Sequence, residues 1–212
     1  MSTATTVVTS TRFEQGLSWA DFLASAKVNR DKFEKNYENP VLTEEDRIFF
    51  RRLSELPNGP RKLLAIAEAW CGDVYRELPT AVHIAELAGI QLRIFLRDEN
   101  PDIMDEFLSN NGKSRAIPVF VFYTTATKYI AHFTERSASA HAGLALAMEQ
   151  ARTKLKLPSS ASLGNISDAE QRQAFLQEVI SRIEPHADQW RRDAVKEMRQ
   201  LLATALHLPG AA

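Results

Sequence analysis

The strongest constraint on the fold of this chain is the order of strand and helix patterns in its middle. Short apolar runs bounded by turn residues predict four strands. The predicted strands are residues 62–68, 91–96, 119–123 and 128–134. Helical patterns over about residues 74–88 and 102–109 separate the first three, whereas the last two read as a hairpin. The order β-α-β-α-β-β therefore predicts an α/β protein, with a mixed sheet flanked by helices.

Helical patterns also lie on both sides of this region. Residues 18–36 and 43–56 carry apolar side chains at helical spacing before it. After it, an alanine-rich helix runs to about residue 157, and a last helical region is split at Pro185. We expect the alanine-rich helix to pack on the core of its own chain. We divide the chain into an N-terminal helical extension packed on the core (1–61), a core (62–157) and a C-terminal helical extension (158–212).

Composition narrows the classes of partner. The 212 residues are 44% hydrophobic and 25% charged, which is ordinary for a globular protein. The formal net charge of −1 offers no positive field to nucleic acid, and no apolar run approaches the ~20 residues that span a bilayer. Residues 1–12 lack the pattern of a secretory signal. We therefore expect no nucleic acid and no membrane partner.

Cys71 is the only cysteine, and it lies between the first predicted strand and the following helix. A lone cysteine excludes an internal disulfide and makes a reducing cytoplasm the simplest compartment. At such a junction, backbone N–H groups and the helix dipole favour the thiolate, which is the reactive form. An inert buried thiol is the alternative, and we favour a reactive one. Val74 stands where a two-cysteine redox motif carries its second thiol.

Other candidate sites are weaker. The five histidines show no metal-ligand spacing, so we expect no metal and no other resident cofactor. A basic cluster of Arg191, Arg192, Lys196 and Arg199 alternates with acidic residues. This alternation predicts a solvated helix face.

Several separate features around Cys71 agree with one known family. Residues 69–73 read Ala-Trp-Cys-Gly-Asp after a strand, and Pro79 lies eight positions after the cysteine. Residues 98–101 read Asp-Glu-Asn-Pro, and residues 115–118 read Arg-Ala-Ile-Pro before another strand. This part of the chain resembles the thioredoxin superfamily. More narrowly, it resembles the bacterial thioredoxin-like proteins whose active site reads Trp-Cys-Gly-Asp-Cys.

The resemblance implies a thioredoxin-like fold with Cys71 as the catalytic nucleophile. It implies a substrate-binding surface made by Trp70, Gly72, Asp73, Ile117 and Pro118. The Ile117–Pro118 bond would be cis, which would turn the Ile117 backbone toward an extended substrate chain. Each of two residues also has a purely structural interpretation. Trp70 could simply pack at the core or its rim, and Asp73 could simply stabilise the first turn of the helix as an acidic residue. The negative charge of Asp73 would raise the pKa of the thiol.

Two departures from the family limit what it implies. Val74 replaces the resolving cysteine, and Ala65 stands where typical thioredoxins bury an aspartate. A dithiol cycle therefore cannot run inside this chain. We expect a single-cysteine thiol–disulfide oxidoreductase acting on protein or small-thiol mixed disulfides, with an external thiol such as glutathione or bacillithiol for release. The alternatives are a redox-inactive binding module with the thioredoxin fold and a cysteine-based redox sensor, so enzymatic activity stays open.

Overall fold

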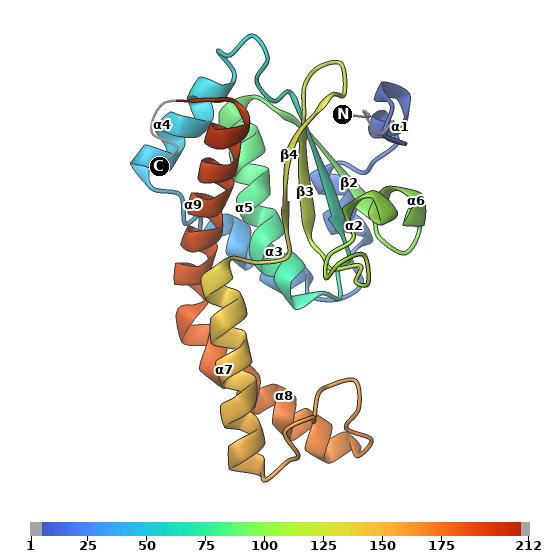
Figure 1. Cartoon of the computed structure of the whole chain (residues 1–212), viewed down its shortest axis with the longest axis vertical. Coiled ribbons are helices and arrows are strands. Elements are labelled where there is room, and N and C mark those ends of the chain that lie inside the picture. The colour runs from blue at the N-terminus through green and yellow to red at the C-terminus, as the bar shows by residue number, and fades with distance from the viewer. Residues whose placement is uncertain (1–5, 209–212) are drawn as a thin grey trace.

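The computed structural model describes residues 6–208, and its centre is a four-stranded sheet (Figure 1). The strands are β1 (Lys62–Ala67), β2 (Gln91–Leu96), β3 (Val119–Tyr123) and β4 (Tyr129–Thr134). Their order in the sheet is β2-β1-β3-β4; β1 and β2 are parallel, and the other pairs are antiparallel. The predicted α/β class and mixed sheet are confirmed.

Helices precede, interrupt and follow this sheet along the chain. They are α1 (Ser10–Glu14), α2 (Trp19–Ser25), α3 (Arg30–Glu38), α4 (Glu44–Leu53), α5 (Gly72–Ala88), α6 (Pro101–Met104), α7 (Ala138–Leu155), α8 (Ala169–Ile183) and α9 (Ala187–Ala205). Short 3₁₀ turns follow α6 (Asp105–Phe107) and α8 (Glu184–His186). Helix α5 packs on β1 and β2, while α3, α4 and α9 pack on α5. In Figure 1, α4, α5 and α9 stand together on the left of the strands, and α1 and α6 lie on the right.

The two central strands are buried along their whole length. All residues of β1 and β3 are buried, which explains why their sequences are continuous apolar runs without alternation. Ala65, at the middle of β1, is fully enclosed in this core, as is Val74 in the first turn of α5. The core therefore extends directly beneath the beginning of α5.

Two predicted helices differ from the structure. The single helix expected over residues 18–36 is wrong, because Asn29 adopts a left-handed conformation with φ 58° and separates α2 from α3. Asparagine tolerates this conformation, and its Nδ2 donates a 2.9 Å hydrogen bond to the carbonyl of Ala69. The helix expected over residues 102–109 stops early and gives way to a 3₁₀ turn ending at Phe107.

Helices α7 and α8 form an arm that extends away from the sheet (Figure 1). We call residues 138–183 the helical arm. The sequence led us to expect α7 on the main core, but its buried Ala147 and Ala151 pack with Phe175 and Val179 of α8 in a separate apolar cluster. The first half of α7 contacts α9 through Trp190.

This contact gives a prediction for Gly143, in the first half of α7. A Cβ on Gly143 would lie 2.2 Å from Cζ2 of Trp190. Helix propensity favours Ala over Gly by about 1 kcal/mol, but overpacking costs about 1–3 kcal/mol. We expect Gly143→Ala to lower the free energy of unfolding by about 1 kcal/mol, measured by urea denaturation. Gly164→Ala, whose Cβ would meet no atom nearer than 3.9 Å, is the control. A more stable Gly143→Ala protein would contradict the contact.

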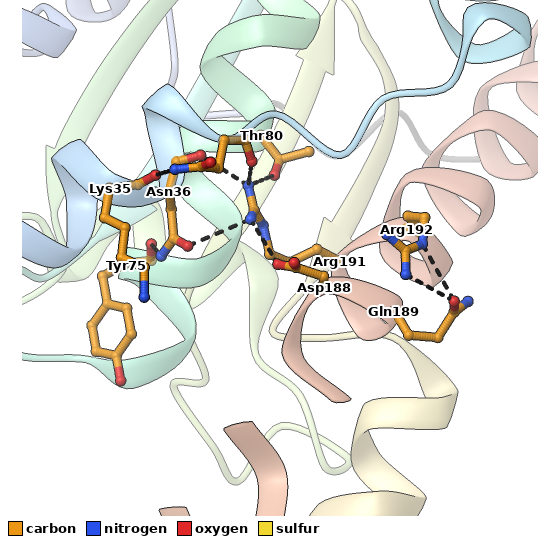
Figure 2. Close-up of polar contacts among 9 residues, drawn as sticks. Lys35, Asn36, Tyr75, Thr80, Asp188, Gln189, Arg191 and Arg192 are labelled. Carbon is orange, nitrogen blue, oxygen red and sulfur yellow. Dashed lines mark hydrogen bonds and ion pairs between the residues drawn. The ribbon is translucent and has the colours of Figure 1, made fainter. Parts of the chain in front are cut away.

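Arg191 of α9 is buried and links three helices (Figure 2). Its guanidinium donates to the carbonyls of Asn36 and Asn39, at 3.0 and 3.2 Å, at the end of α3. It also donates to Thr80 Oγ1 of α5 at 3.4 Å and to Asp188 Oδ1 at 3.3 Å. A single side chain from the C-terminal part of the chain thus ties α3 to α5.

The predicted solvated face of α9 is therefore wrong for Arg191. Arg192, the next residue, is exposed and donates to the side chain of Gln189 (Figure 2). Arg199 forms ion pairs with Glu45 and Asp46 of α4. The basic residues of this helix thus differ in their surroundings, and two of them, Arg191 and Arg199, fix α9 to neighbouring helices.

Candidate functional site

Cys71 lies at the junction between β1 and α5. It is the N-cap of α5, which begins at Gly72, two residues earlier than the sequence pattern indicated. The Cys71 amide donates to the carbonyl of Glu68 at 3.1 Å, and the Glu68 carboxylate accepts from the Asp98 amide at 3.0 Å. With the bond from Asn29 to the preceding loop, these contacts fix the position of the thiol.

The segment before β3 meets this thiol. The Ile117–Pro118 peptide bond is cis, as predicted. The Cys71 Sγ donates a weak hydrogen bond to the Ile117 carbonyl, with 3.6 Å between sulfur and oxygen. The structure therefore brings together Cys71, Ile117 and Pro118 from two loops that are distant in sequence.

Trp70 forms the rim of the site. Its side chain is 53% exposed, although it is large and apolar. The guanidinium of Arg97 lies 4.9 Å from the centre of its ring, in a cation–π contact, and also pairs with Asp98 at 2.8 Å. Because β1 and β2 are parallel, the residues that follow them lie at the same sheet edge. That topology is the signal that could have added Arg97 to the predicted site.

A half-buried group of ion pairs involves Asp73, two residues after Cys71. Arg136, from the loop before α7, pairs with both Asp73 and Glu135. Gly72 and Asp73 form the first turn of α5, and the Cβ position of Gly72 lies 3.2 Å from a guanidinium nitrogen of Arg76. Nothing in the sequence pattern singled out Arg136, because its partner is 63 residues away.

The net environment of Cys71 favours the neutral thiol. Burial raises its pKa most strongly, and the charge of Asp73 raises it further. The N–H groups of Val74 and Asp73 and the charge of Arg136 lower it, but burial outweighs them. The hydrogen bond to the Ile117 carbonyl also requires the proton to stay on sulfur. The helix N–H groups lower the pKa as the sequence predicted, whereas the larger contribution of burial was not predicted.

The site offers no metal centre within residues 6–208. No group of three or more His, Cys, Asp or Glu side chains there could hold a metal ion. None of the helices in this range combines the length and the apolar character needed to cross a bilayer.

Comparisons with known proteins found one matching family model and two similar solved structures. A family model described as Thioredoxin matches residues 16–152. The crystal structure of an HIV epitope scaffold superposes with a TM-score of 0.54 and 16% identity, over 91% of this chain and 95% of the scaffold. A Pseudomonas aeruginosa protein of unknown function aligns with a TM-score of 0.49 and 18% identity, over 82% of this chain and 95% of that protein. No curated protein matches the chain.

Proposed function

Because this chain belongs to the thioredoxin family, we propose that it is a single-cysteine thiol–disulfide oxidoreductase. The Cys71 thiolate would attack one sulfur of a protein or small-thiol mixed disulfide. A new disulfide then joins Cys71 to one half of the substrate, and the other half leaves as a thiolate that takes a proton from water. An external thiol such as glutathione or bacillithiol would attack this intermediate, forming a new disulfide and restoring Cys71.

The position of Cys71 carries this proposal. The thiol is half-exposed at the first turn of α5 and faces the backbone carbonyl of Ile117. The exposed Trp70 beside it offers apolar surface to a protein partner. A disulfide approaching over Trp70 could therefore reach the sulfur. A reducing compartment such as the cytoplasm would supply the external thiol.

The raised pKa of Cys71 favours a second candidate function. A thiol that stays neutral at pH 7 reacts slowly, and a chain without a second cysteine cannot resolve its own mixed disulfide. Both observations suit a redox-inactive binding module that keeps the thioredoxin fold. In that case Trp70, Ile117 and Pro118 would bind the partner without chemistry.

An assay of mixed-disulfide reduction separates the two candidates. A peptide carrying a glutathione or bacillithiol mixed disulfide is incubated with the protein and free small thiol, and released peptide thiol is measured across pH. The oxidoreductase predicts release that rises about tenfold per pH unit below the thiol pKa, and that is lost in Cys71→Ser. No release at any pH would overturn it. Partner binding that survives Cys71→Ser would then support the module.

A further inference from the structure

A small cavity with a mixed charged and apolar lining lies beside the N-terminal end of α5, where the helical arm and α9 meet this helix. Its charged lining comes from Asp73, Arg76 and Glu77 of α5 and from Arg136, and Trp190 of α9 closes one wall. The Asp73–Arg136 pair next to Cys71 thus also forms part of this cavity. The lining of the cavity therefore includes both this ion pair and Glu77, one helical turn further along α5.

Glu77 is the buried group of this cavity. Only 3% of the residue is exposed, and within residues 6–208 its Oε2 has no hydrogen-bond partner. It lies one helical turn after Asp73, so the two carboxyl groups share a face of α5. Burying a charged carboxylate oxygen without a hydrogen-bond partner costs folding free energy, and the cost is smaller when the group is neutral. The burial of Glu77 therefore calls for an explanation.

The charges around Glu77 come from three elements. They are Arg191 from α9, Arg136 from the loop before α7, and Asp73 and Arg76 from α5 itself. Arg76 is also paired with Glu184 at 3.7 Å, and Arg136 is shared with Glu135. Burial raises the pKa of Glu77 to about 8, with Asp73 adding to the rise and Arg191 opposing it most. Glu77 is therefore mainly neutral at pH 7 and ionises as the solution becomes alkaline.

We propose that Glu77 is a positioning residue that controls the ionisation of Cys71 through the Asp73–Arg136 pair. While Glu77 is neutral, the positive charge of Arg136 is shared between its carboxylate partners and the thiolate. Once Glu77 ionises, a further negative charge stands beside Asp73 and competes for Arg136. Removing the proton from Cys71 then becomes harder.

The size of this coupling follows from distance. Six residues of α-helix separate Glu77 from Cys71, which is about 9 Å along the axis. At an effective dielectric constant of about 20, one unit charge at that distance shifts a neighbouring pKa by about one unit. The effect depends on pH, because the pKa of Cys71 rises only in the pH range where Glu77 is charged.

The test is the alkylation rate of Cys71 by iodoacetamide from about pH 6 to about pH 10. Glu77→Gln keeps the shape of the neutral acid but cannot ionise. The wild-type and Glu77→Gln curves should coincide below about pH 7 and diverge above about pH 8, where the variant reacts up to about tenfold faster. Glu86→Gln, which removes an exposed carboxylate from the same helix, should follow the wild type throughout.

Two results would overturn the proposal. One is a pair of superimposable or uniformly offset curves for wild type and Glu77→Gln. The other needs no variant: a wild-type curve with a single step and no inflection near pH 8, where Glu77 should titrate. The proposal rests on the proposed function only in taking Cys71 as the reacting group. Alkylation does not depend on disulfide turnover, so a failed reductase assay and a failed coupling test are distinguishable.

Discussion

Arg191→Ala is expected to lower the free energy of unfolding by about 3–5 kcal/mol, the range for removing one partner of a buried, charged network. The substitution removes the Arg191 donor from the carbonyls of Asn36 and Asn39 and from the hydroxyl of the buried Thr80. Each buried acceptor that loses its partner costs about 1–3 kcal/mol. Urea denaturation followed by far-UV circular dichroism measures the change.

The neighbouring residue provides the matched control. Arg192 carries the same side chain on the same helix, but it is exposed and donates only to Gln189. Arg192→Ala should therefore stay within about 0.5 kcal/mol of the wild type. Arg191→Lys should recover little stability, because one ammonium cannot reproduce the fork of a guanidinium. Equal effects of Arg191→Ala and Arg192→Ala would show that the buried network does not stabilise the fold.

Val74→Cys is expected to let the protein form an internal disulfide between positions 71 and 74. Positions 71 and 74 are three residues apart at the start of α5, and side chains at this spacing are neighbours within reach of a disulfide. Val74 is fully buried, so a thiol of smaller volume fits its place. Under mild oxidation both thiols should disappear into an internal disulfide, as measured by thiol titration and mass spectrometry.

The same substitution should shorten the life of a mixed disulfide at Cys71. An internal thiol held next to the bond acts at a far higher effective concentration than an external one. Release of glutathione from glutathionylated protein should accelerate by about 100-fold or more. Val74→Ala removes the same side chain without adding a thiol and should release glutathione at the wild-type rate. Two free thiols that persist under oxidation would mean that the geometry at α5 does not match a two-cysteine site.

Local sequence signals predicted the framework of this fold well. The continuous apolar runs at β1 and β3 identified buried strands, and the helical spacing of apolar residues over 43–56 identified α4. The strands and the helix are encoded within a few neighbouring residues, which is why the sequence alone could reveal them. The cis bond at Pro118 was implied by the resemblance of the Arg-Ala-Ile-Pro segment to the thioredoxin superfamily.

Features that depend on distant contacts were harder to predict. The break at Asn29 depends on a hydrogen bond to Ala69, and the burial of Arg191 depends on carbonyls that end α3. The apolar periodicity of α9 did contain a clue, because Arg191 shares a face with Val195 and Met198. The alternation of charged residues along the same segment obscured this periodicity. The rise in the pKa of Cys71 was not predicted for a related reason. Its main cause is burial, which depends on the whole fold and not on the helix terminus alone.

The position of α9 affects how this protein can be made in a cell. Its buried face covers parts of α4, α5 and β4, and about fifty residues separate the end of β4 from its first turn. At ribosomal rates of roughly 5–20 residues per second, synthesis reaches the first turn of α9 about 3–10 s after it completes β4. During that interval an apolar strip of the nascent chain is open to solvent. A chaperone that shields such strips would find its binding site on this protein then, and lose it once Arg191 has closed over α3.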